Sequence, residues 1–337
     1  MNNESKLLWE QPDWQKQAHN WIFTETTRQD IQIAGEIEQS HIYQWSTVMR
    51  VPTNEGTLFF KASAEDVAPE AALTQALAGW YPDCMPELMA IDTQRGWMLM
   101  RDGGAPLRAS IRSTGNLALW NPVITLYAKV QIGLADHLSE LLALGIRDWR
   151  LKTLPARYTK LLEDTEMLQL EQPGGLTSDE FRQLKNLSSR FAQICADLAG
   201  FGIPESLNHG DFHDGNILLR NGRVTLFDWG DGNLTHPFVS LRTFFVSIEN
   251  SLKLEDYAFT PEMAALLDLY LEPFQRFASK QDLLDAFPLS RCVAAIVKAL
   301  AWRIGISSLT GSLREKYAGI VPELLREFMV YEKMLSA

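Results

Sequence analysis

Apolar and polar residues alternate in the first third of the chain, in the manner of half-buried strands. After a leading helix predicted at residues 12–24, this alternation runs through three segments, at residues 31–37, 46–51 and 57–62. A turn at residues 54–56 makes the second and third segments antiparallel neighbours. A further apolar run, at residues 97–100, predicts a buried strand. This part of the chain is therefore expected to form a small antiparallel sheet.

From residue 121 onward the apolar positions follow helical spacing instead. One helix is predicted from residue 121 to Gly145. A second helix is predicted to begin at Thr177, because Thr177-x-x-Glu180 matches a capping box, and to end before Gly200. Further helices are predicted to start near Pro237, Pro261, Ser279 and Pro322. Strands followed by helices indicate an α+β fold.

A predicted hairpin interrupts the helical pattern. Two apolar runs, at residues 217–219 and 224–227, flank Asn221-Gly222, a strong signal for a two-residue turn. Pairing of Arg220 with Arg223 would bring Asn216 level with residue 227, beside Asp228. Strict alternation would then point the two side chains to opposite faces. Their proximity therefore requires Asn216 to lie in the loop before strand pairing begins.

The residues around this hairpin carry the groups that phosphoryl transfer requires. Residues 209–216 read His-Gly-Asp-Phe-His-Asp-Gly-Asn, and Asp228-Trp-Gly follows the hairpin. Phosphoryl transfer from ATP needs a carboxylate to orient the acceptor hydroxyl and oxygen ligands to hold Mg²⁺. Asp211, with Asn216 five residues later, matches the kinase catalytic loop, and Asp228-x-Gly matches the metal-binding turn.

On these residues the chain resembles the aminoglycoside phosphotransferase and choline kinase family, small-molecule relatives of the protein kinases. The resemblance implies a bilobal protein-kinase-like fold, with a small antiparallel-sheet amino lobe in residues 1–102 and a larger, mostly helical carboxyl lobe in residues 103–337. It also implies that Asp211 is the catalytic base and that Asn216 and Asp228 bind Mg²⁺. His209 and His213 match family positions, but their chemical role is left open.

In a kinase-like amino lobe, a lysine on the third strand contacts the ATP phosphates and a helix glutamate holds that lysine in place. Lys61 occupies the matching strand position, and Glu70 follows Pro69 at a predicted helix start. The resemblance therefore assigns both to nucleotide binding. Taken alone, Lys61 would be a surface lysine of a strand and Glu70 a complement to the helix dipole.

Two weaker nucleotide contacts are expected. The strand at residues 97–100 ends where a kinase-like hinge would lie, so that the backbone near Met100 would meet adenine. No G-x-G-x-x-G lies between the first two strands, where residues 38–44 are expected to form the loop. Backbone N–H groups or Ser40 would hold the phosphates there instead.

The predicted function is therefore transfer of the ATP γ-phosphate, with Mg²⁺, to a hydroxyl of a small molecule such as an aminoglycoside-, choline- or sugar-like acceptor. A small acceptor is expected because no activation segment ending in Ala-Pro-Glu follows Asp228. Candidate contributors to the acceptor side also have simpler roles as solvated or core residues; they are Asp231, Glu249, Glu255, Asp256 and Trp302.

Two other functions are considered. A non-catalytic nucleotide-binding sensor is weakened by the joint presence of Lys61, Asp211, Asn216 and Asp228. A metal-dependent hydrolase could use His209-x-Asp211-x-His213-Asp214, because histidine and carboxylate suit Zn²⁺ or Fe. The hairpin and Asp228 would then be unexplained, and the remaining histidines form no second cluster; they are His19, His41, His137 and His236.

The amino-acid composition limits the classes of partner that are expected. The 337 residues, 46% hydrophobic and 22% charged, suit a folded protein large enough for two lobes. A net charge of −11 argues against a nucleic-acid or membrane partner. Isolated cysteines at positions 84, 195 and 292, and the lack of a signal sequence or spanning segment, favour a cytoplasmic protein. The pattern carries no expectation about oligomeric state.

Overall fold

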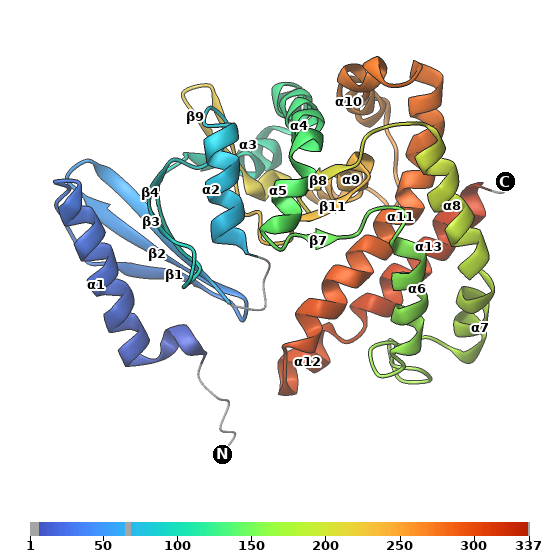
Figure 1. Cartoon of the computed structure of the whole chain (residues 1–337), viewed down its shortest axis with the longest axis horizontal. Helices are drawn as coiled ribbons and strands as arrows, with labels where there is room; N and C mark the ends of the chain where they lie inside the picture. Colours follow the sequence, from blue (N-terminus) through green and yellow to red (C-terminus); the bar gives the residue numbers. More distant parts are fainter. Residues whose placement is uncertain (1–6, 65–68, 336–337) are drawn as a thin grey trace. The chain divides into compact units, whose positions relative to one another are not determined.

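The strands and helices fall into two parts that alternate along the sequence (Figure 1). The structure is a computed structural model that describes residues 7–64 and 69–335. The amino part comprises Met1–Ala105 with Ile217–Gly230, and the carboxyl part comprises Pro106–Asn216 with Asp231–Ala337. The boundary predicted after residue 102 lies three residues before Ala105 ends the first segment, and the structure groups the hairpin with the amino part.

The amino part is built on a five-stranded antiparallel sheet of order β1-β2-β3-β5-β4. Helix α1 (Pro12–Arg28) covers one face and α2 (Glu70–Trp80) lies on the other (Figure 1). A short 3₁₀ turn, Leu8–Glu10, precedes α1. The strands are β1 (Glu38–Ile42), β2 (Ser46–Thr53), β3 (Gly56–Ser63), β4 (Leu88–Asp92) and β5 (Trp97–Arg101).

Alternation along β3 sorts its side chains between the two faces. Leu58, Phe60 and Ala62 join the core beneath α1, together with α1 residues such as Ala18. Lys61 therefore points to the opposite face, towards α2. Cross-strand register pairs Lys61 with Met98 and Phe59 with Met100, so these β5 residues share the face of Lys61.

The first predicted strand is misplaced. Residues 31–37 form a single bridge, between Ile33 and Thr53, and the first true strand begins at Glu38. Pro52 explains the difference, because it accepts a hydrogen bond from Ala34 N but has no N–H to return. The loop expected at residues 38–44 is consequently strand β1, and the turn to β2 is residues 43–45.

The carboxyl part is mostly helical, with α11 packed against α8 and α13 (Figure 1). Its small mixed sheet has the order β7-β11-β8 and is built from Arg147–Asp148, Asn233–Thr235 and Ser206–Asn208. The helices are α3 (Leu107–Thr114), α4 (Asn121–Leu134), α5 (Leu138–Ala143), α6 (Leu154–Glu163), α7 (Ser178–Asn186), α8 (Ser188–Gly200), α9 (Ser240–Leu252), α10 (Pro261–Leu271), α11 (Lys280–Ser307), α12 (Gly311–Tyr317) and α13 (Ile320–Leu335). Across residues 7–64 and 69–335, no helix combines the length and hydropathy of a membrane span.

The helices lie where the sequence predicted them, but two of the predicted helices are interrupted. Thr177 and Glu180 form the capping box, with the Glu180 carboxylate accepting from Thr177 N at 2.8 Å. The helix that follows is interrupted at Leu187 into α7 and α8. The helix predicted from residue 121 to Gly145 is likewise divided, by a 3₁₀ turn at Ala135–His137. Helix α9 begins after the 3₁₀ turn Pro237–Val239.

The hairpin is confirmed residue by residue. Strand β9 (Ile217–Arg220) pairs with β10 (Arg223–Leu226), with Arg220 opposite Arg223 and Ile217 opposite Leu226. Asn221 and Gly222 have φ angles of 50° and 82°, as a type I′ turn requires. Asn216 lies before the paired residues, at the end of a 3₁₀ turn that starts at Asp214. Short strand β6 (Ala105–Pro106) continues this sheet beyond β9.

Candidate active site

In the amino part, Lys61 lies between two carboxylates. Its ammonium is 2.5 Å from Glu70 Oε1, at the start of α2, and 2.7 Å from Asp228 Oδ1. Ser63 Oγ donates a hydrogen bond of 2.5 Å to the other oxygen of Glu70. Lys61 and Glu70 are buried, whereas 44% of the Asp228 side chain is exposed. The cluster therefore meets solvent at Asp228.

Lys61 stays charged although it is buried. Burial alone would lower the pKa of Lys61, because the ammonium loses its hydration. The charges of Asp228 and Glu70 outweigh that effect and raise the pKa of Lys61 above its ordinary value. The amino part thus holds a permanent cation beside a partly exposed carboxylate, a combination suited to phosphate and to a bound cation.

The turn after β10 fixes the direction of Asp228. Asp228 has a φ of 65°, a left-handed conformation that aspartate and asparagine adopt more readily than most residues. The next residue, Trp229, is fully buried, and its Nε1 donates to Leu226 O at 3.2 Å. The anchored turn therefore holds the Asp228 carboxylate beside Lys61.

The structure places the residues of the two weaker nucleotide predictions on different strands. Met100 is half-buried in β5, on the sheet face that carries Lys61, and its contact with adenine stays a prediction. Ser40 is exposed in strand β1, at the irregular step of its pairing with β2, and its Oγ donates to Val48 O at 3.4 Å. The structure therefore places Ser40 on a sheet edge, not in the loop that the sequence suggested.

In the carboxyl part, Phe212 anchors the loop that carries Asp211. The Phe212 side chain is fully buried and stacks on Tyr127 with ring centroids 3.8 Å apart. Trp120 and Phe244 pack against the same ring. The Tyr127 hydroxyl accepts a hydrogen bond of 3.1 Å from His209 N. Loop residues on both sides of Asp211 are thereby fixed to the helical core.

Three side chains hold the Asp211 carboxylate. Lys298 Nζ lies 3.1 Å from Oδ1, and His213 Nε2 lies 3.1 Å from Oδ2. Asn216 Nδ2 donates to the Asp211 backbone oxygen at 2.9 Å and to Oδ2 at 3.3 Å. A carboxylate has about four acceptor positions. These contacts use three of them, and 35% of the side chain is exposed, so a hydroxyl can still approach Asp211.

Asp211 is consequently ionised and a weak base. Burial would raise the pKa of this carboxyl, but the charge of Lys298 and the hydrogen bond from His213 lower it far below its ordinary range. A carboxylate of this kind accepts hydrogen bonds at every pH near neutrality. Its chemistry therefore favours orienting a hydroxyl over removing its proton early.

Hydrogen bonds fix the tautomer of His213. Gly215 N donates to His213 Nδ1 at 3.0 Å, and Arg108 Nη2 lies 3.2 Å from the same atom. Both groups can only donate, so Nδ1 is an acceptor and the ring proton is on Nε2. Arg108 is itself fixed by Asp214, 2.6 Å away and buried. His213 is therefore a neutral donor to Asp211.

The same logic fixes Asn216. Its Nδ2 faces two oxygens of Asp211, which can only accept, so the Asn216 amide oxygen points elsewhere. Amide and carboxylate oxygens are the ligands that Mg²⁺ prefers. Asn216 in the carboxyl part and Asp228 in the amino part each therefore supply a donor atom of the right chemistry.

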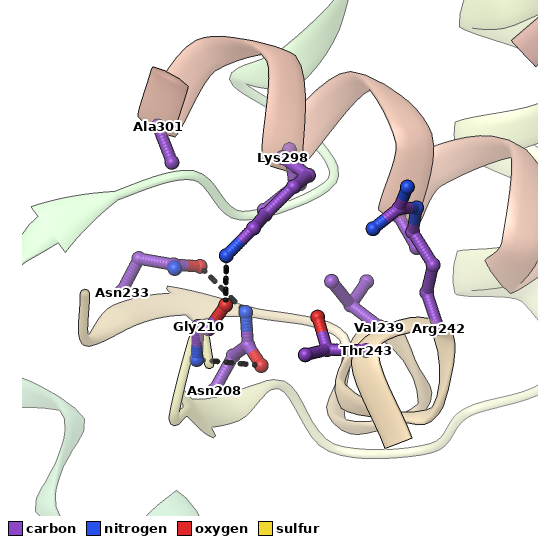
Figure 2. A pocket seen from close by; sticks show the side chains of 10 residues that line it. Asn208, Gly210, Asn233, Val239, Arg242, Thr243, Lys298 and Ala301 are labelled. Carbon is purple, nitrogen blue, oxygen red and sulfur yellow. Dashed lines mark hydrogen bonds between the residues drawn. The ribbon is translucent and has the colours of Figure 1, made fainter. Parts of the chain in front are cut away.

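Lys298 was missed by the sequence reasoning. It lies in α11, and its ammonium reaches Gly210 O at 2.9 Å, between Asn208 and Asn233 (Figure 2). Asp231 Oδ2 is 3.5 Å from the same ammonium. One signal was available, because Lys298 is the single charged residue in the apolar run at 292–302. A half-buried lysine among apolar residues needs acceptors, but the run does not say where they lie.

The other acceptor-side candidates lie apart from Asp211. Glu249 lines a hollow with Arg291 and Tyr331, and burial raises its pKa to about 7. Glu255 and Asp256 are in the connection between α9 and α10. Trp302 packs on Tyr317 with centroids 5.5 Å apart. Asp231, which contacts Lys298, is the member of this group that the structure brings to the site.

His209 and His213 make hydrogen bonds within the loop that carries them. His209 is fully buried, and its Nδ1 accepts from Asp211 N at 3.3 Å. His213 Nδ1 is engaged by Gly215 and Arg108. Within the described ranges, no three His, Cys, Asp or Glu side chains gather as metal ligands.

Comparison with known proteins gives one family match. Residues 122–242 match the family model described as the phosphotransferase enzyme family, and this segment contains Asp211, Asn216 and Asp228. The match confirms the predicted resemblance to a phosphotransferase family over these residues. A search of curated proteins finds no significant match.

Several solved structures with a similar fold are described as kinases of small molecules. An ethanolamine kinase from Plasmodium vivax is similar with a TM-score of 0.64 and 12% identity, over 96% of this chain and 91% of that one. A choline kinase from Streptococcus pneumoniae has a TM-score of 0.57 and 13% identity, over 91% and 99%. An amicoumacin kinase in complex with AMP-PNP has a TM-score of 0.54 and 10% identity, over 94% and 96%. These likenesses confirm the protein-kinase-like α+β fold.

Proposed function

We propose that the protein transfers the γ-phosphate of ATP to a hydroxyl of a small molecule, with Mg²⁺ on the phosphates. The observation that carries this proposal is the Asp211 carboxylate, held ionised by Lys298 and fixed in direction by His213 and Asn216. An ionised, partly exposed carboxylate at this position can orient the hydroxyl of an acceptor. The complex of the amicoumacin kinase with AMP-PNP supports the use of a nucleotide by this fold.

The amino part is assigned to the nucleotide. Lys61 would contact the α and β phosphates, and Glu70 keeps its ammonium in place on the sheet face shared with Met100. Adenine would meet the backbone near Met100. Ser40 lies on the edge strand, and its contact with the phosphates stays a prediction from the sequence.

Mg²⁺ would neutralise phosphate charge as transfer proceeds. Asn216 and Asp228 are the residues assigned to hold it. Asp228 fits this role because a cation, Lys61, already sits 2.7 Å from its Oδ1 in a partly exposed position. Asn216 fits because its nitrogen is committed to Asp211 and its oxygen is not.

Asp211 would accept a hydrogen bond from the acceptor hydroxyl and direct its oxygen towards phosphorus. A low pKa suits a loose transition state, in which the hydroxyl proton departs late and little base strength is needed. The proton then passes to Asp211 as the new P–O bond forms. His213 and Lys298 hold the carboxylate still during this step.

We expect ATP to stabilise the protein more strongly when Mg²⁺ is present. A ligand that binds only the native state adds about 2.7 kcal/mol to the unfolding free energy at 100 times its Kd. A thermal unfolding series with ATP, Mg²⁺ and both together measures this effect, with AMP as the control that lacks the β and γ phosphates. No response to ATP, together with tight retention of Zn²⁺, would favour the hydrolase alternative.

We expect ADP to form only when a suitable hydroxyl compound is added. Acceptor screening should include amino alcohols, sugars and nucleosides, with ADP release as the readout. Mass spectrometry of the product then identifies the phosphorylated hydroxyl. Tight binding of Mg²⁺ and ATP without turnover on any class of acceptor would instead favour the nucleotide-binding sensor.

A further inference from the structure

Three ring side chains stack beside one another where β1 turns into β2. The ring centroids of His41 and Tyr43 are 6.2 Å apart with 10° between the planes, and those of Tyr43 and Trp45 are 6.0 Å apart with 2° between the planes. His41 and Tyr43 are both exposed. Residues 38–53 contain no glycine. A stack of rings therefore stands where a protein kinase would have its glycine-rich loop.

Strand register puts this stack on the sheet face that carries Lys61. His41 lies opposite Val48 of β2, and Val48 lies opposite Lys61 of β3. Residues directly opposite each other in an antiparallel pair point to the same face, so His41 and Lys61 share a face, two strands or roughly 10 Å apart. The irregular step of the pairing lies before His41. Alternation therefore places Tyr43, whose N–H donates to Ser46 O at 2.9 Å, on this face as well.

The same register sets the order of the proposed nucleotide contacts along β3. Phe59 lies opposite Met100, where adenine would lie. Lys61 follows two residues later, and Ser63, after two more, lies opposite Ser46 beside the turn. At about 3.4 Å per residue, the distance along β3 from Phe59 to Ser63 is about 14 Å. A nucleotide with its base at Met100 and its α and β phosphates at Lys61 would therefore extend its γ-phosphate towards the turn.

His41 and Tyr43 bring hydrogen-bond donors to this end of the face. A neutral imidazole has one N–H and a phenol has one O–H. Among residues 7–64 and 69–335, neither the His41 imidazole nor the Tyr43 hydroxyl has a hydrogen-bond partner. The Ser40 hydroxyl, in contrast, already donates to Val48 O. Phosphate oxygens are charged acceptors, and hydrogen bonds to such acceptors are stronger than those between neutral groups.

Building on the proposed phosphotransferase function, we propose that the side chains of His41 and Tyr43 bind the γ-phosphate of ATP. They supply from side chains the contacts that the glycine-rich loop supplies in protein kinases. Stacking with Trp45 keeps the rings nearly parallel before the nucleotide arrives, so little side-chain freedom is lost on binding. Lys61 meets the α and β phosphates, and the two rings meet the phosphate that is transferred.

Phenylalanine at either position keeps the ring and removes the donor. His41→Phe and Tyr43→Phe should each lower the affinity for ATP with Mg²⁺ about tenfold, as expected for loss of one hydrogen bond to a charged group. ADP should lose less affinity and AMP none, because these nucleotides lack the phosphate that reaches the turn. Calorimetry with the three nucleotides measures the ratio of ATP to AMP affinity for each variant.

Two further variants serve as controls. His41→Gln keeps an N–H donor on a side chain of similar reach and should keep most of the affinity for ATP. His19→Phe makes the same change as His41→Phe at an exposed position of α1, which covers the opposite face of the sheet, and should alter nothing. The substituted rings are exposed, so we expect each variant to unfold at the wild-type temperature.

Three results would overturn the inference. Wild-type affinity for ATP in both phenylalanine variants contradicts it directly. An equal loss of affinity for ATP, ADP and AMP would show that the γ-phosphate is not the group bound. A loss in His41→Gln as large as that in His41→Phe would show that the donor is not the cause. Absence of ATP binding to the wild-type protein is a different failure, since it removes the proposed function itself and this inference with it.

Discussion

Replacing Asp211 with asparagine should lower phosphoryl transfer by about 10²–10⁴-fold, the usual range for loss of a positioned general base. Asparagine matches the size of aspartate but loses its charge and one acceptor oxygen. Lys298 and His213 both donate to the carboxylate in the wild-type protein, so one of them would face an amide that cannot accept. The acceptor hydroxyl would then lose the group that orients it.

Nucleotide binding should survive this change. Lys61, Glu70 and Asp228 lie in the amino part, and their contacts with one another do not involve Asp211. We therefore expect Asp211→Asn to keep most of the affinity for ATP with Mg²⁺. Single-turnover transfer and calorimetry of ATP binding separate the two effects. Full transfer activity in this variant would show that another group orients the hydroxyl.

Asp268→Asn is a matched control for this experiment. Asp268 is half exposed in α10 and pairs with Lys280 on the surface, a contact that contributes little to stability. The same chemical change at this position should leave both transfer and binding unaltered. A comparable loss in both variants would point to a general effect on folding and not to the chemistry of Asp211.

The features that the sequence predicted well have local causes. The hairpin follows from two apolar runs and one Asn-Gly turn, all within residues 217–227, and its register agrees with the prediction. The pairing of Lys61 with Glu70 follows from one strand and the helix that begins nine residues after Lys61. Neighbouring residues determine these elements, so patterns in a short window are sufficient to find them.

The features that were missed depend on distant partners. Residues 31–37 alternate like a strand, but Pro52 of the neighbouring strand cannot complete the hydrogen bonds of the pair. Lys298 is separated from Asp211 by 87 residues, and nothing near either residue indicates the contact. His213 could be placed in the motif, but its donor role depends on Arg108 and on the fold of the loop. Tertiary contacts decide each of these cases.

Replacing Asp228 with asparagine should remove the advantage that Mg²⁺ gives to nucleotide binding. The asparagine side chain would retain an oxygen but lose the negative charge that holds a divalent cation. The affinity for ATP with Mg²⁺ should fall roughly tenfold or more, as expected for loss of one charged contact. Turnover should fall as well. The backbone should tolerate the change, because asparagine adopts the φ of 65° found here as readily as aspartate.

Without Mg²⁺, the expected effect of Asp228→Asn on the affinity for ATP has the opposite sign. Asp228 repels the phosphates of free ATP, so its neutralisation should leave metal-free binding unchanged or slightly tighter. Lys61 remains held by Glu70 at 2.5 Å, so the phosphate contact persists in the variant. The ratio of ATP affinities with and without Mg²⁺ should therefore approach one. Glu70→Gln provides the contrast, because loosening Lys61 should weaken ATP binding in both conditions.

Calorimetry of ATP binding at several Mg²⁺ concentrations measures this ratio for the wild type and for Asp228→Asn. Asp92→Asn is the control in the same part of the chain, since Asp92 caps a turn by accepting from Gln94 N and Arg95 N, and asparagine can cap it equally. An unaltered Mg²⁺ dependence and unaltered turnover in Asp228→Asn would place the metal elsewhere. The assignment of the Asp228-Trp-Gly turn to metal binding would then have to be abandoned, because it rests on this carboxylate.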